Sequence, residues 1–154
     1  MEYGSIEREL RIDATPEVVF EVISSPEHLR EWWPDGAELD PVPGATGAIT
    51  FGDPTAPDAT IVPLTVLEAD PPRRFAFRWV YDEGESPTPA SSLVVTFDLV
   101  PSGDGTLLRF AETGFRERGW EAAVLEEAYL DHVRGWDLFL PRLVTYANRL
   151  VARP

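Results

Sequence analysis

The chain has 154 residues, 44% of them hydrophobic and 26% charged, which is the composition of an ordinary globular protein with one domain over residues 1–154. Its formal net charge of −14 repels a phosphate backbone, so nucleic acid is not expected as a partner. Cysteine and lysine are absent, which excludes disulfides, thiolate nucleophiles and Schiff-base lysines.

The first predicted elements are one strand and two short helices. Residues 5–13 alternate between apolar and charged side chains, which indicates a strand, and Arg8 falls on its apolar face. The Thr-Pro pair at 15–16 is typical of a helix start, because threonine caps the helix and proline suits its first position. The Ser-Pro pair at 25–26 repeats this signal, and a second helix is expected to run to about residue 33.

The middle of the chain contains a series of predicted strands separated by turns that are rich in proline and glycine. They are a short strand near 37–40 and longer strands at 47–51, 59–69, 73–82, 91–101 and 106–115. Aromatic side chains share one face of the strand at 73–82. The sequence Ser-Gly-Asp-Gly at 102–105 predicts a hairpin between the last two strands.

A long helix is predicted over 129–151, after a helical lead-in at 121–128. Apolar residues recur there at alternating steps of four and three, which is the pattern of one apolar stripe along a helix. These residues are Tyr129, Val133, Trp136, Leu140, Leu143, Ala147 and Leu150. A helix of this length extends for about 35 Å and needs a broad partner surface, which the strands supply.

This order of elements predicts an α+β fold. We expect a curved antiparallel sheet of six to seven strands around the long C-terminal helix. Any functional chemistry is expected between the sheet and that helix.

Four separated motifs occur in an order that a known family shares. They are ATPEVVF at 14–20 with SPEHL at 25–29, the Trp pair at 32–33, GTLLR at 105–109 with Gly-Phe at 114–115, and Gly-Trp at 135–136 followed by Leu140 and Leu143. The chain thus resembles the activator-of-Hsp90-ATPase-homologue-like branch of the START/Bet v 1-like (SRPBCC) superfamily. The resemblance implies a helix-grip fold whose cavity often holds an apolar ligand. Nothing in the sequence corresponds to the chaperone-binding domain of the eukaryotic co-chaperone, which argues against a chaperone contact.

Arg8 and Glu112 both fall on apolar strand faces. In the fold that the resemblance implies, the first and last strands are neighbours, which is expected to bring the two side chains together. A structural ion pair is one interpretation, because a single buried charge is costly. A polar handle for a ligand and an error in the assigned register are the others. His132 flanks the apolar stripe and is the natural general-base candidate, or else a residue at the rim of the cavity bonded to water or to a carbonyl.

Aromatic side chains give the stronger indication of function, since aromatic walls suit an apolar ligand. The alternative is that they fill the core. Trp79 and Trp136 need partners for their indole N–H groups if they are buried. The candidate ligand-binding residues are Trp32, Trp33, Phe77, Trp79, Tyr81, Phe97, Phe110, Glu112, Arg8, Tyr129, His132, Trp136 and Leu140, with Phe139 as a further aromatic residue.

No nucleophile motif, phosphate loop or dinucleotide fingerprint is present, and we expect no catalytic set, cofactor or metal. The leading hypothesis is a non-enzymatic protein that binds a small apolar or aromatic molecule. One alternative is a polyketide cyclase/dehydratase-like enzyme that uses Glu112, His132 or Arg8 as acid and base. Another is a chaperone-accessory or stress interaction module. The sequence leaves a homodimer open.

The sequence also bears on the location of the protein. Residues 1–10 lack the apolar segment of a secretory signal. No apolar run approaches the roughly 20 residues that span a bilayer. We therefore expect no membrane span and a cytoplasmic location.

Overall fold

The computed structural model describes residues 4–53, 55–79 and 92–152. Within them, the strands are β1 (Ser5–Ile12), β2 (Gly36–Glu38), β3 (Thr46–Phe51), β4 (Thr60–Asp70), β5 (Arg74–Trp79), β6 (Leu93–Ser102) and β7 (Gly105–Thr113). The helices are α1 (Pro16–Ser24), α2 (Pro26–Trp32) and α3 (Ala122–Ala152). The predicted strands therefore form, with ends shifted by one or two residues wherever both ends are described.

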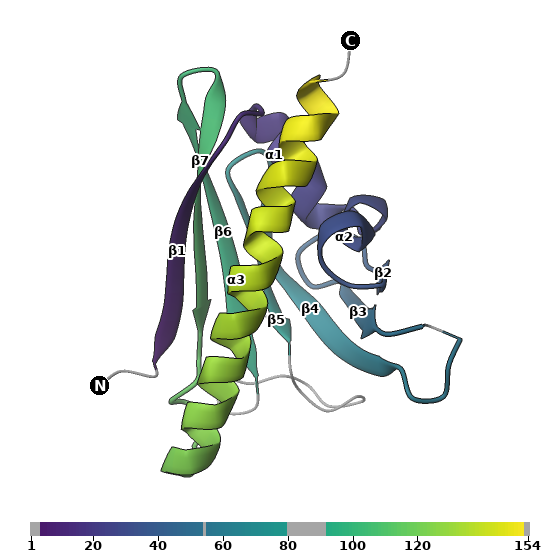
Figure 1. Ribbon diagram of the computed structural model, residues 1–154, viewed down its shortest axis with the longest axis vertical. Coiled ribbons are helices and arrows are strands. Elements are labelled where there is room, and N and C mark those ends of the chain that lie inside the picture. Colours follow the sequence, from purple (N-terminus) through teal and green to yellow (C-terminus); the bar gives the residue numbers. More distant parts are fainter. Residues whose placement is uncertain (1–3, 54, 80–91, 153–154) are drawn as a thin grey trace.

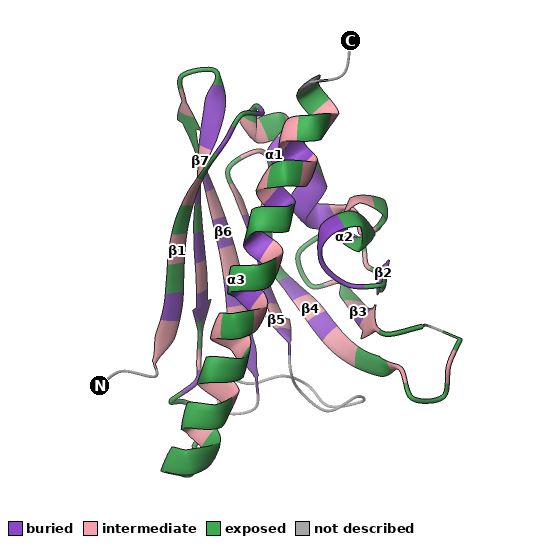
Figure 2. Cartoon of the chain, in the orientation of Figure 1, coloured by how far each residue is buried: buried purple, intermediate pink, exposed green. Residues whose placement is uncertain are grey.

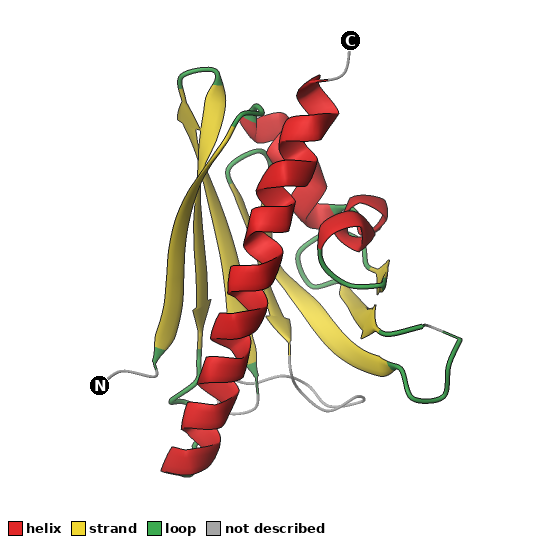
Figure 3. Ribbon diagram, viewed as in Figure 1, coloured by secondary structure: helices red, strands yellow, loops and turns green. Residues whose placement is uncertain are grey.

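The strands form one antiparallel sheet in the order β1-β7-β6-β5-β4-β3-β2. The first and last strands are neighbours, as predicted, with Ile6 opposite Glu112 and Arg8 opposite Phe110. α1 contacts β5, β6, β7 and α3, while α2 contacts α3 and β2, so the helices gather on one face of the sheet (Figure 3). Figure 1 shows α3 crossing that face along the whole length of the sheet. The helix-grip arrangement of an α+β fold is confirmed.

The N-terminal helix begins where its sequence predicts. The hydroxyl oxygen of Thr15 accepts a hydrogen bond from the amide of Val18 at 3.4 Å, and Pro16 occupies the first turn. Val19, Val22 and Ile23 on the inner side of α1 are fully buried against the sheet. This buried side packs α1 on β5, β6 and β7.

The predicted lead-in and the predicted long helix form a single helix of 31 residues, which continues through Pro141. Its stripe packs on the core as expected: Trp136, Leu140, Leu143 and Ala147 are buried. By contrast, the half of α3 before Trp136 contains no buried residue (Figure 2). The helix is thus anchored by its second half, and its first half stands over the sheet with looser packing.

The core lies between the helices and the inner face of the sheet. Its largest fully buried side chains include Trp32, Phe75, Phe97, Phe110 and Phe115. None of the helices in the described part of the chain combines the length and the hydropathy needed to cross a membrane.

Candidate functional site

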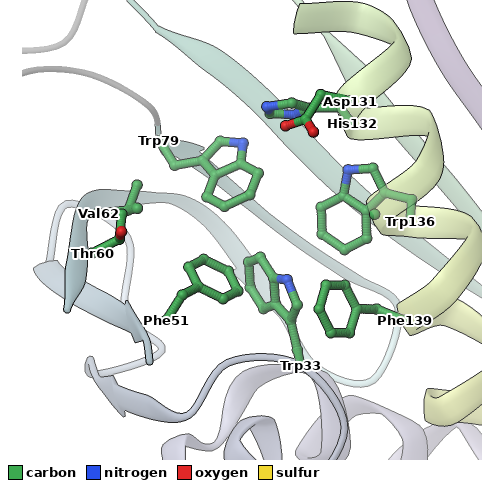
Figure 4. A pocket seen from close by; sticks show the side chains of 10 residues that line it. Trp33, Phe51, Thr60, Val62, Trp79, Asp131, His132, Trp136 and Phe139 are labelled. Atoms are coloured by element: carbon green, nitrogen blue, oxygen red, sulfur yellow. The ribbon is translucent and has the colours of Figure 1, made fainter. Parts of the chain in front are cut away.

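A cleft opens between the first half of α3 and the β3–β5 part of the sheet (Figure 4). Its volume is about 360 Å³. It is lined by Trp33, Phe51, Thr60, Val62, Trp79, Asp131, His132, Gly135, Trp136 and Phe139. Aromatic and aliphatic side chains dominate this wall, and among the described residues its polar side-chain groups are those of Thr60, Asp131 and His132 and the indole N–H groups. This composition is typical of a site for a small, largely apolar ligand.

Three indole rings from three different elements meet at the cleft. Trp33 follows the last residue of α2, Trp79 ends β5, and Trp136 lies on α3. The ring centre of Trp33 is 5.1 Å from that of Trp136 and 5.2 Å from that of Trp79. Such tilted and edge-on contacts are favourable between aromatic rings. They fix the three side chains against one another, so the aromatic part of the wall is formed in advance.

Behind these rings lies Glu112, a carboxylate with 0% exposure on the inner face of β7. Its Oε2 accepts a hydrogen bond from Nε1 of Trp79 at 2.8 Å. Its Oε1 accepts one from Nε1 of Trp136 at 2.8 Å and contacts Nδ1 of His132 at the same distance. A buried carboxylate without partners would be very unfavourable, and these three groups supply the compensation. The predicted need of both indoles for an acceptor is met by this one side chain.

His132 connects the buried carboxylate to the cleft. Its side chain is 18% exposed and stands between the rings of Trp79 and Phe115, at 5.7 and 5.5 Å. Burial lowers the pKa of His132, but the hydrogen bond and the charge of Glu112, aided by the charge of Asp131, outweigh it and raise the pKa overall. The contact with Glu112 uses Nδ1, and no described residue hydrogen-bonds to Nε2. The imidazole thus offers one polar atom to the cleft.

The predicted pairing of Arg8 with Glu112 is wrong. Arg8 does leave β1 on the inner side, but its Nε donates to Oδ1 of Asp137 at 2.9 Å, and its Nη2 donates to Oδ2 at 3.2 Å. The reason is register, because Arg8 lies opposite Phe110 and α3 presents Asp137 to it. The hydrogen bond to Asp137 raises the pKa of Arg8 further, against the effect of burial. Arg8 therefore ties α3 to β1 and does not line the cleft.

Of the predicted ligand-binding residues, the structure places four in the cleft wall: Trp33, Trp79, His132 and Trp136. Phe139, a further aromatic candidate, also lines it. Tyr81 lies outside the described residues.

The other candidates lie elsewhere, so they are corrections to the predicted site. Phe77, Phe97, Phe110 and Leu140 are buried in the core and Glu112 is buried behind the cleft wall. Trp32 is also buried and donates its N–H to the carbonyl of Val22 at 3.0 Å. Tyr129 donates its hydroxyl to the carbonyl of Ser5 at 2.8 Å, near the end of β1. Most of the aromatic set thus fills the core, which was the alternative interpretation of it.

Sequence reasoning missed five residues of the wall: Phe51, Thr60, Val62, Asp131 and Gly135. Phe51 lies two residues after the buried Ile49 on β3 and so shares its face of the sheet, which means that strand parity could have found it. Thr60 and Val62 lie before a register shift in β4 between Val66 and Glu68, which parity within one strand does not show. Among the described residues, no group of three or more His, Asp or Glu side chains is arranged to hold a metal ion.

The sheet order, the long helix and the cleft beneath it define a helix-grip protein of the START/Bet v 1-like class. Protein MLL2253 from Mesorhizobium loti has this fold, with a TM-score of 0.74 and 24% identity over 94% of this chain and 97% of that one. The Aha1 dimer from Colwellia psychrerythraea gives a TM-score of 0.68 and 19% identity over 94% and 96%. DynU16, from the dynemicin biosynthetic locus, gives 0.69 and 20% over 93% of this chain and 46% of that one. These identities show a shared fold.

The family follows from the sequence itself. The model of the activator of Hsp90 ATPase homolog 1-like protein family matches residues 13–148, and the chain belongs to this family. The resemblance seen in the four motifs is confirmed. None of the curated proteins matches the sequence.

Proposed function

We propose that the protein binds a small apolar or aromatic molecule in the cleft beneath α3. The observation that carries this proposal is the meeting of Trp33, Trp79 and Trp136 at the edge of the core, where these largely buried rings also form one wall of the cleft. A volume of about 360 Å³ falls at the lower end of the range of roughly 300–1,000 Å³ that ligand pockets occupy. A ligand stacked against three fixed rings would order few side chains on binding, which keeps the entropic cost low.

The contact between Glu112 and His132 favours one second candidate, an enzyme that transfers a proton to or from its ligand. A carboxylate that orients an imidazole is a recurring arrangement in general acid–base catalysis. Arg8 has no part in this candidate, because it pairs with Asp137 outside the cleft. Turnover of a bound molecule would distinguish this activity from binding alone.

The proposed binding is tested on protein purified without denaturation. Organic extraction and mass spectrometry should recover an apolar or aromatic compound from the native chain. The matched control is Gly135→Leu, since Gly135 lines the cleft and a Cβ added there meets no atom within 4 Å. Its side chain would occupy the cleft, so the compound should be lost. Equal recovery from both proteins would contradict the proposal.

The homodimer that the sequence left open is a separate proposal. The relative from Colwellia psychrerythraea is described as a dimer, and it covers nearly the whole of this chain. Sedimentation equilibrium at two concentrations measures the mass directly. A mass of 17.2 kDa at both concentrations would rule out the dimer, because this is the mass of one chain.

A further inference from the structure

His132 lines the cleft together with Trp79 and Trp136, and like them it contacts the buried carboxylate of Glu112, but its ring carries a second nitrogen, Nε2, that Glu112 does not use. We propose that the ligand carries a carbonyl or similar uncharged oxygen, and that this oxygen accepts a hydrogen bond from Nε2 of His132 while the apolar body of the ligand lies against the three indoles. This inference rests on the proposed function and adds the chemical class of the ligand. Its basis is the geometry of the Glu112–His132 contact.

The direction of the hydrogen bond follows from that contact. Both imidazole nitrogens are donors when the ring is protonated. In that protonated form Glu112 accepts from Nδ1 at 2.8 Å and the second proton stands on Nε2, to which no described residue hydrogen-bonds, while His132 is one of the residues that line the cleft. The raised pKa of His132 keeps this protonated form up to a higher pH than in an ordinary histidine. A ligand oxygen in the cleft would therefore meet a donor.

The charges around the ring argue for an uncharged ligand. With His132 protonated, its contact with Glu112 is an ion pair with no net charge, so neither an anion nor a cation gains much from the pair as a whole. Asp131, the other charged group at the wall, is 75% exposed in its side chain and has Arg134 at 3.8 Å. Trp79 and Phe115, which flank the ring from the sheet side, carry no charge. An aromatic cage for a cation would require a wall without the imidazolium.

Three naphthalene probes separate these possibilities. 2-Acetylnaphthalene has the carbonyl, 2-isopropenylnaphthalene has nearly the same shape without an acceptor, and (2-naphthyl)trimethylammonium is the cationic analogue. Calorimetric titration at neutral pH should give about tenfold tighter binding for the acetyl probe than for the isopropenyl probe, as expected for a hydrogen bond from a charged donor. The cationic probe should bind more weakly than both.

Two variants test whether His132 is the donor that makes the acetyl probe bind more tightly than the isopropenyl probe. His132→Phe should bring the two neutral probes to equal affinity. His28→Gln should keep the preference, because His28 contacts the hydroxyl of Tyr146 at 2.6 Å and does not line the cleft. If His132→Phe does not fold, the pH dependence of the native protein serves instead. The preference should fall as the pH rises and Nε2 becomes an acceptor.

Three other results of the probe titrations would overturn this inference, and one of them would also overturn the proposed function. Equal affinity of the two neutral probes for the native protein would overturn this inference and leave the cleft as an apolar site. Tighter binding of the cationic probe would overturn it in favour of an aromatic cage. No binding of any probe would overturn the proposed function and this inference with it.

Discussion

Oε1 of Glu112 and Nδ1 of His132 lie 2.8 Å apart, although the two residues belong to a strand and to a helix that meet only in the folded protein. The same oxygen accepts the indole N–H of Trp136, and the second oxygen accepts that of Trp79. A single buried carboxylate thus holds β5, β7 and α3 together beneath the cleft. The stability of the fold and the shape of the site depend on the same group.

Replacing Glu112 by glutamine should destabilise the protein strongly. The carboxylate accepts hydrogen bonds from three groups, and the NH₂ of the glutamine amide would face at least one of these donors. A buried polar group would then be left unpaired. We expect a loss of roughly 3 kcal/mol in the free energy of unfolding, measured by chemical denaturation. The matched control is Glu9→Gln, whose partner Arg109 lies at 3.1 Å between side chains that are 57% and 60% exposed. A control loss as large as that of Glu112→Gln would contradict this account.

Stability should depend on pH through His132. Its pKa is raised in the folded protein, so the folded state binds the proton more tightly than the unfolded state does. The contribution of His132 is fully present below the ordinary histidine pKa of about 6.5, and it is lost as the pH rises through the raised value. The difference in unfolding free energy between the native protein and His132→Gln should therefore be largest below about pH 6.5 and shrink as the pH rises above it.

The background of Glu112→Gln provides the control for this titration. Without the carboxylate, the hydrogen bond and the charge of Glu112 no longer raise the pKa of His132, while burial still lowers it and only the smaller effect of Asp131 still raises it. In this background, the difference in unfolding free energy between His and Gln at position 132 should no longer decline as the pH rises. A decline of the same size in both backgrounds would show that another group is responsible.

The pair of Arg8 and Asp137 should contribute little to stability. Its side chains are 35% and 51% exposed, and exposed ion pairs are worth at most about 1 kcal/mol. A double-mutant cycle with Arg8→Gln and Asp137→Asn measures the coupling by chemical denaturation. Arg8→Gln should also leave the binding of 2-acetylnaphthalene unchanged. A coupling of several kcal/mol would contradict the small contribution expected of this pair. A lost probe preference in Arg8→Gln would mean that Arg8 acts on the cleft.

Gly135 offers a way to separate stability from binding. It lies inside α3 at the cleft wall, and a Cβ added there meets nothing within 4 Å. Gly135→Ala should raise the unfolding free energy by about 0.5–1 kcal/mol, because alanine is the better helix former. Gly135→Leu should fold equally well and lose 2-isopropenylnaphthalene in calorimetry, while Gly135→Ala retains it. A strongly destabilised Gly135→Ala would contradict an open space at this position.

The sequence predicted the fold well because the fold depends on local patterns. Thr15 and Pro16 start α1 as expected, and the stripe from Trp136 to Ala147 packs α3 on the core. The adjacency of β1 and β7 is also confirmed, and it was expected from the family resemblance. These features need no knowledge of which side chains meet across the sheet.

The site was less predictable because it depends on long-range registration. Glu112 and Arg8 were both placed correctly on inner faces, yet their partners are residues of α3 that only the docking of the helix selects. Parity also made Phe97 and Phe110 candidates for the cleft. They do not line the cleft, because they lie in the core and pack on each other with ring centres 5.5 Å apart.

The central claim is that ligands enter the cleft lined by three of the five tryptophans. The most direct measurement is the NMR titration of the five indole N–H signals with 2-acetylnaphthalene. The signals of Trp33, Trp79 and Trp136 should shift together. Those of Trp32, which donates to Val22, and of Trp120, which packs under Arg118, should stay in place. Shifts confined to Trp32 or Trp120, or no shift at saturating probe, would contradict the claim.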